Sequence, residues 1–222
     1  MKKIQYLLLI TIAFTQVSCF EIVELITLKN DGSGTFKYTI NFSQSSTKIK
    51  SLLLMDEVEG YRVPTLNIIK NKFAKIGETS KTVKGISYVK TESNFTDFIF
   101  TYSCHFTKIK QINSIIDSLS KKAFPDQEHQ SNYFNYSIPK MIFTRIGDDV
   151  LKNYYNKLPE NQRAIFNSAT FTSVCKFEGN IIKQTHSKAL VSANKKAILH
   201  KMNISSLIKN GNIINKQVYL KK

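Results

Sequence analysis

The segment from residue 95 to residue 106 has the most restrictive pattern in the chain. From Phe98 to Phe106, aromatic side chains and one cysteine occupy every second position, and mostly polar side chains lie between them. Successive side chains of a β-strand point to opposite faces, so this alternation predicts a strand with one buried face. Cys104 lies on that face with its aromatic neighbours. Such a strand belongs to a sheet that other elements cover on one side.

A hairpin is predicted near the start of the folded region. Residues 21–29 and 35–43 have strand-like patterns, and Asn30-Asp31-Gly32-Ser33-Gly34 between them is a strong turn signal. The tetrapeptides 47–50 and 107–110 are both Thr-Lys-Ile-Lys, and each follows an aromatic strand and opens a predicted helix. This agreement has two interpretations: chance in a chain rich in Lys and Ile, or a repeated strand–strand–helix unit.

Other elements follow from caps, breakers and periodicity. Pro64 is expected at a first helical position and Gly77 at the end of that helix. Pro139 divides an extended segment, and Asp148-Asp149 favours a helix start. Further elements are predicted at 85–91, 107–119, 159–167, 169–178, 181–186, 197–203 and 213–220, with Ser205-Ser206 as the cap of a last short helix. The predicted fold class is α+β, an antiparallel sheet built from hairpins with helices packed on one face.

The N-terminus has the order of a secretory signal. Basic residues at Lys2 and Lys3 precede a short apolar run, and Ser18 stands immediately before Cys19. The apolar run is too short to span a bilayer. With a cysteine at the expected cut, the segment resembles a bacterial lipoprotein signal peptide. The alternatives are a buried N-terminal element and a signal that is cleaved without lipidation.

The resemblance implies that residues 1–18 are removed and that 19–222 form a single mature α+β domain. It also implies lipidation of Cys19, with diacylglycerol and palmitate-type chains that hold the protein on a membrane. Phe20 follows the cysteine, so the aspartate that retains lipoproteins at the inner membrane in some bacteria is absent. We therefore expect an outer-membrane lipoprotein that faces the periplasm.

The chain is strongly basic, with a formal net charge of +16. All but three of its 32 basic residues are lysines, the exceptions being Arg62, Arg145 and Arg163. Nucleic-acid sites rely on the bidentate arginine fork, so nucleic acid is not the expected partner. The lysine excess is either compositional or directed at anionic lipid or polysaccharide, and an envelope protein is a further possible partner.

Two cysteines remain for the folded region. Cys104 and Cys175 both lie on predicted apolar strand faces, so they form either a disulfide or two separate buried thiols. No metal site or cofactor is predicted, and no residue is assigned a catalytic role. The histidines at 105, 129, 186 and 200 belong to no recognisable motif, and Asp148-Asp149 suits a helix start better than a cation site.

The sequence therefore predicts a non-enzymatic binding or scaffolding lipoprotein of the envelope. One alternative is a carrier of an apolar ligand or lipid, suggested by Phe98, Phe100 and Tyr102. Another is an envelope hydrolase, which would require a pocket joining a histidine to Asp148 or Asp149. From Ala169 onward, the order strand, turn, strand and short helix is similar to LppM-type lipoproteins, without a shared residue motif.

Overall fold

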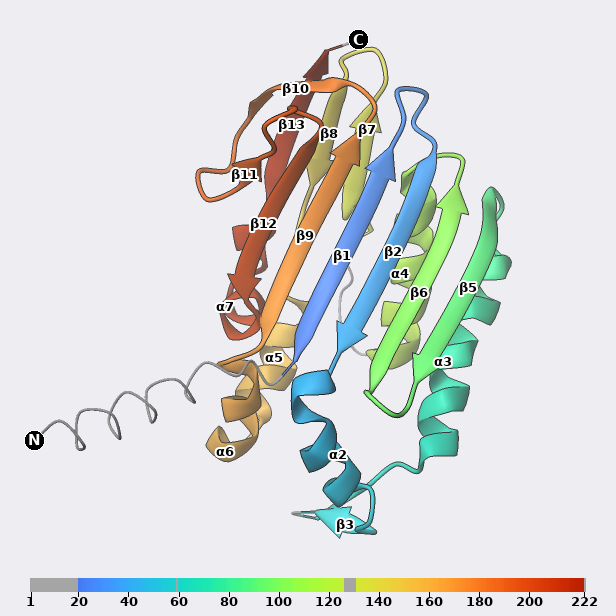
Figure 1. Ribbon diagram of the computed structural model, residues 1–222, viewed down its shortest axis with the longest axis vertical. Helices are drawn as coiled ribbons and strands as arrows, with labels where there is room; N and C mark the ends of the chain where they lie inside the picture. The colour runs from blue at the N-terminus through green and yellow to red at the C-terminus, as the bar shows by residue number, and fades with distance from the viewer. Residues whose placement is uncertain (1–19, 59, 126–130, 222) are drawn as a thin grey trace, which may run out of the picture.

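Two β-sheets and a set of helices form the layers of the molecule (Figure 1). The computed structural model describes residues 20–58, 60–125 and 131–221. The larger sheet has seven strands in the order β11-β12-β9-β1-β2-β6-β5. Its strands are β1 Glu21–Leu28, β2 Gly34–Asn41, β5 Ile86–Asn94, β6 Ile99–Phe106, β9 Thr170–Phe177, β11 Leu190–Val191 and β12 Ala197–Asn203. All neighbouring strands are antiparallel except β1 and β9, which are parallel.

The smaller sheet has four strands in the order β10-β13-β8-β7. These are β7 Phe134–Ser137, β8 Ile142–Arg145, β10 Asn180–Gln184 and β13 Lys216–Lys221, and a short pair is formed by β3 Glu57–Val58 and β4 Tyr61–Arg62. The helices are α2 Ser46–Leu52, α3 Leu66–Lys81, α4 Lys110–Ala123, α5 Val150–Lys157, α6 Glu160–Arg163 and α7 Ile204–Lys209. Short 3₁₀ turns are η1 Ser43–Ser45, η2 Ala164–Phe166 and η3 Gly211–Ile214.

The predicted α+β class is confirmed, and one face of the large sheet is covered in two different ways. Helices α3 and α4 lie behind the β2-β6-β5 half, and the smaller sheet lies behind the β12-β9-β1 half (Figure 1). The opposite face of the large sheet has no helix or second sheet in front of it (Figure 1). We call this side the uncovered face.

The predicted β1–β2 hairpin is confirmed, and its turn explains its register. The carboxylate of Asp31 accepts hydrogen bonds from the backbone N–H of Ser33 at 2.9 Å and from the Ser33 hydroxyl at 2.7 Å. Gly32 between them has φ = +84°, a conformation that glycine adopts without strain. This register turns Ile26, Leu28 and Phe36 into the core.

The helix-covered half has an apolar core. Ile112 and Ile115 of α4 are buried in one cluster with Tyr102, Cys104 and Phe106 of β6. The α3 helix does not end at Gly77 as predicted but continues to Lys81. A Cβ at Gly77 would lie 3.1 Å from Thr91 Cγ2, so the glycine allows α3 to pack closely on β5.

Strand β6 begins at Ile99, four residues later than its sequence pattern predicts. The side chain of Asn94 explains the difference, because its Oδ1 accepts hydrogen bonds from the backbone N–H groups of Thr96 and Asp97. This local turn links β5 to β6 and competes with strand pairing. Phe98 is nevertheless buried, as predicted for that face.

Of the two interpretations of the shared Thr-Lys-Ile-Lys sequence, a repeat of equivalent units is not supported, because the two helices pack differently. Helix α4 packs on the sheet, whereas α2 contains no fully buried residue. Met55, shortly after the end of α2, is 52% exposed, and Leu54 beside it is 89% exposed. The shared Thr-Lys-Ile-Lys sequence therefore lies near the start of two helices with different environments, within α2 and at the boundary of α4.

The disulfide alternative for Cys104 and Cys175 is wrong in this fold, since both are free, buried thiols. They lie in one row across the sheet, where Cys175 pairs with Ile26, Ile26 with Phe36, and Phe36 with Cys104. Three strand spacings separate the cysteines by about 14 Å, which is beyond the reach of a disulfide. Burial raises the pKa of both thiols.

Two features of the C-terminal region complete the fold. Asn203 caps α7 by accepting a hydrogen bond from the backbone N–H of Ser206, although the sequence favoured Ser205 or Ser206 as the cap. Pro139 separates β7 from β8, as predicted. Within the described ranges, every helix is too short or too polar to cross a bilayer.

Candidate functional site

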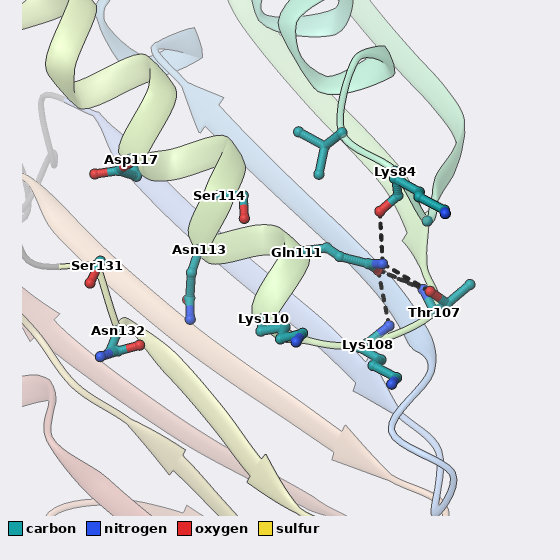
Figure 2. Close-up of a pocket in the computed structure, with 12 residues that line it drawn as sticks. Lys84, Thr107, Lys108, Lys110, Gln111, Asn113, Ser114, Asp117, Ser131 and Asn132 are labelled. Carbon is teal, nitrogen blue, oxygen red and sulfur yellow. Dashed lines mark hydrogen bonds between the residues drawn. The ribbon is translucent and has the colours of Figure 1, made fainter.

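A polar groove runs along α4 on the helix-covered side of the molecule (Figure 2). Its volume is about 930 Å³ and it opens to solvent. It is lined by the connection between α3 and β5, by the first turns of α4, and by the residues before β7. The polar lining residues are Lys84, Thr107, Lys108, Lys110, Gln111, Asn113, Ser114, Asp117, Ser131 and Asn132.

Gln111 fixes one wall of this groove (Figure 2). Its Oε1 accepts hydrogen bonds from the backbone N–H groups of Thr107 and Lys108, both at 3.0 Å. Its Nε2 donates to the carbonyl oxygen of Lys84 at 2.8 Å. A Cβ at Gly85 would lie 1.8 Å from Gln111 Nε2, so the glycine makes room for the amide. The start of α4 is thus held against the end of the α3–β5 connection.

The groove carries a positive charge. Lys84, Lys108 and Lys110 are exposed at its rim. Its carboxylate, Asp117, forms an ion pair with Lys121 at 2.9 Å, so its charge is already compensated. With hydroxyl and amide groups between the lysines, this lining suits an anionic, polar ligand.

A second polar feature lies in the core, between the two sheets. Glu24, Ser173 and His200 are register neighbours on β1, β9 and β12. Arg145 and Lys216 are register partners on β8 and β13 of the smaller sheet. All five side chains point into the space between the sheets and belong to buried residues, and we call them the polar row.

Glu24 is the centre of the polar row. Arg145 binds it with two nitrogens, Nη2 to Oε2 at 2.9 Å and Nε to Oε1 at 3.2 Å. The hydroxyl of Ser173 also donates to Glu24 Oε1 at 3.0 Å and accepts from Lys216 Nζ at 2.9 Å. One carboxylate therefore compensates two buried cations, directly for Arg145 and through a hydroxyl for Lys216.

The geometry of the polar row argues for a structural role. A serine hydroxyl beside a lysine amine resembles a nucleophile and its base. Ser173 is 0% exposed, however, and its oxygen is already hydrogen-bonded to both Glu24 and Lys216. A substrate cannot reach it without separation of the two sheets.

His200 ends the polar row beside His186, with ring centroids 4.0 Å apart. Burial lowers the pKa of His200 to about 4, and the nearby His186, Lys216 and Lys188 act in the same direction. Nδ1 of His200 is buried without a hydrogen-bond partner. His186 Nε2 lies 2.9 Å from the carbonyl oxygen of Ile213. The His200 ring is therefore neutral at pH 7 and serves as part of the core.

The remaining sequence candidates lie apart from one another. Cys19 and His129 fall outside the described residues. His105 is exposed, and its ring is tilted by 45° relative to the Tyr88 ring, with 4.7 Å between the two centroids. Asp148 accepts a hydrogen bond from the Tyr133 hydroxyl at 2.6 Å, and Asp149 accepts one from the backbone N–H of Gly211 at 2.7 Å.

The two aspartates thus hold neighbouring segments at the start of α5, and the groove contains neither of them and no histidine. Among residues 20–58, 60–125 and 131–221, no group of three or more His, Cys, Asp or Glu side chains could hold a metal ion.

Sequence reasoning missed the polar row and the groove. The signal for the polar row was present: Glu24, Ser173 and His200 each interrupt the inward, apolar side of an alternating strand. For the groove there was no such signal, because Lys84 comes from the α3–β5 connection and Lys108 and Lys110 come from the start of α4, and all three are ordinary surface residues in the sequence.

Comparison with known proteins finds matches among the solved structures. No family model matches the chain, and no curated protein matches it. The fold is similar to the folded domain of LppM from Mycobacterium tuberculosis, solved by NMR, with a TM-score of 0.42 and 8% sequence identity over 94% of each chain. The order of elements after Ala169 also resembles LppM-type lipoproteins. A similarity of this size identifies no function.

Proposed function

We propose that this chain is a lipid-anchored envelope lipoprotein whose folded part binds an envelope component without catalysis. The pattern of residues 1–19 supports the anchor. Phe20 is buried against Phe42 and Phe166, and β1, a central strand, begins at Glu21. An acylated Cys19 would thus be joined directly to the folded part.

Cys19 acylation is tested by labelling growing cells with a palmitate analogue. The wild-type chain and a Cys104→Ala control are expected to carry the label, and Cys19→Ala is expected to lose it and leave the membrane fraction. Equal labelling of Cys19→Ala, or no labelling of the wild type, would contradict the anchor.

The proposed location is the outer membrane, with the folded part in the periplasm. Protease added to intact cells is expected to leave the protein whole and to digest it only after the outer membrane is opened. Release of the folded part from intact cells would place it on the cell surface instead.

The binding role rests on one observation, the lysine-rimmed polar groove of Figure 2. Its three exposed ammonium groups, with a carboxylate that Lys121 already neutralises, favour an anionic ligand such as a phosphorylated polysaccharide. The two alternatives from the sequence gain no support from this groove, because ten of its twelve lining residues are polar or charged and none is a histidine.

A triple substitution tests the groove. Changing Lys84, Lys108 and Lys110 to Ala is expected to reduce binding of a phosphorylated oligosaccharide at least about tenfold at low salt. A matched control changes the exposed Lys70, Lys72 and Lys75 of α3 to Ala and removes the same charge elsewhere. Equal losses of binding in both variants would show that the ligand responds only to the net charge of the protein. No loss of binding in either variant would contradict the groove as a binding site.

A further inference from the structure

The uncovered face carries an aliphatic row. Leu25 of β1 pairs with Val174 of β9, Val174 with Leu199 of β12, and Leu199 with Leu190 of β11. These four side chains, which we call the aliphatic row, alternate with the inward-facing residues of their strands. Leu190 is 67% exposed and Leu199 is 38% exposed. Four neighbouring strands thus present a continuous apolar strip to the outside.

Lysines border this strip. Lys37 of β2 pairs with Leu25, and Lys176 and Lys201 stand two residues from Val174 and Leu199 on the same strands. Across β12, β9, β1 and β2, this face carries these three lysines and one acid, Glu21, which forms an ion pair with Lys201 at 3.8 Å and leaves Lys37 and Lys176 as the uncompensated charges. Apolar side chains surrounded by lysines match the chemistry of an anionic membrane surface.

The position of the proposed anchor limits the orientation of the folded part relative to the membrane. Phe20 is bonded to Cys19 and is itself buried, and its carbonyl oxygen accepts a hydrogen bond from the backbone N–H of Thr170 at 3.1 Å. One residue spans less than about 4 Å. An acylated Cys19 would therefore bring the start of β1 to the bilayer, and a surface next to Phe20 must lie on the lipid.

Two surfaces adjoin the start of β1: the end of the sheet and the uncovered face. At the sheet end, α2, α6 and β3 project beyond the start of β1 (Figure 1). Helix α2 alone has seven residues, a length of about 10 Å, and would hold β1 away from a bilayer on that side. No described element stands in front of the uncovered face (Figure 1).

We propose that the uncovered face lies on the anionic phospholipid surface that holds Cys19, with the aliphatic row in the interface and the lysines on the headgroups. This inference rests on the proposed acylation of Cys19. It turns the groove along α4, on the opposite side of the sheet, away from the membrane and toward soluble or cell-wall ligands.

The test places one fluorophore at a time on the mature lipoprotein in vesicles. A polarity-sensitive dye is attached at Leu199→Cys on the uncovered face, at Leu54→Cys on the sheet end, or at Ile182→Cys on the smaller sheet, all exposed positions. The native Cys104 and Cys175 are buried and remain unlabelled. The vesicles contain phosphatidylglycerol and phosphatidylcholine, with or without bromine near the top of the acyl chains.

A blue shift and bromine quenching are expected at position 199 and not at 54 or 182. Quenching at 54 without quenching at 199 would show end-on contact and overturn the proposal. A dye at 199 that is exposed to water on vesicles but protected in native envelopes would indicate a protein partner and would also overturn it.

Charge reversal gives a second readout. Lys37→Glu with Lys176→Glu is expected to weaken the shift at 199, whereas Lys72→Glu with Lys75→Glu on α3 leaves it unchanged; equal effects would contradict headgroup contact. The intact mass of the same sample separates the two hypotheses. A preparation without lipid on Cys19 contradicts the proposed anchor. The dye at position 199 then tests only whether the uncovered face binds vesicles when the unlipidated protein is added to them.

Discussion

The two halves of the large sheet are covered by different chemistry. Under β2, β6 and β5, the helices α3 and α4 bury an apolar layer in which the Phe73 and Phe100 rings meet edge to face, 5.6 Å apart. Under β1, β9 and β12, the smaller sheet also buries apolar side chains, such as Phe143, Ile198 and Val218, and in addition it encloses the polar row around Glu24. The apolar half depends on shape and packing density. The polar half depends on every charge having its partner.

This difference predicts how each half fails. An apolar core loses the transfer free energy of the atoms that are removed, together with the cost of the cavity. A buried ion network loses more when one partner is removed, because the charges left behind remain desolvated. The following three changes test this contrast, from the largest expected effect to the smallest.

Glu24→Leu is expected to cost the most. It leaves Arg145 and Lys216 buried without their carboxylate, so we expect the free energy of unfolding to fall by about 3–5 kcal/mol. Urea denaturation measures the change. The control Glu92→Leu removes an exposed carboxylate of the same sheet and should change stability by less than about 0.5 kcal/mol. Similar small losses of stability in both variants would mean that the ion pairs of the polar row do not stabilise the fold more than an exposed carboxylate does.

Ile112→Ala probes the helix-covered half. Ile112 is 1% exposed in the first turn of α4, and its truncation should cost about 3 kcal/mol through lost burial and a cavity. Ile68→Ala on α3, at a 45% exposed position, is the matched control and should cost much less. An Ile112→Ala variant as stable as the wild type would show that α4 is loosely packed on the sheet.

His200 gives the polar half a dependence on pH. Its folded pKa of about 4 lies below the ordinary value of 6.5, so between these values the unfolded chain binds a proton that the folded chain does not. The contribution of His200 to stability is therefore constant above about pH 7 and should fall by on the order of 2 kcal/mol from about pH 7 to pH 4.

His200→Gln is expected to reduce this slope, whereas His105→Gln, at an exposed position, should leave it unchanged. Denaturation curves at several pH values measure it. An unchanged slope in His200→Gln would assign the pH dependence to other groups.

The same contrast explains which parts of the fold the sequence predicts. The hairpin of β1 and β2, the aromatic face of β6 and the stripe of α4 follow from local periodicity, and all three are confirmed. The parallel pairing of β1 with β9 joins residues about 150 positions apart, and no local pattern encodes it. The separation of Cys104 from Cys175 depends on that strand order and was equally out of reach.

The sites were harder to predict than the fold. Glu24 and Ser173 interrupt apolar strand faces, which is a visible signal in the sequence. Their partners Arg145 and Lys216 come from a second sheet, and no sequence pattern predicts that this sheet packs on the first. The groove and the aliphatic row are made by neighbours in space, such as Lys84 with Lys110 or Leu25 with Leu199. Each of these residues is unremarkable within its own segment.

The intact mass of the protein purified from its native membrane tests the central claim most directly. The account predicts a chain that begins at Cys19 and carries lipid on that residue, with Cys104 and Cys175 as free thiols. A chain that retains residues 1–18, or one that begins elsewhere without lipid, would contradict the anchored lipoprotein and remove the reason for placing the uncovered face on a bilayer.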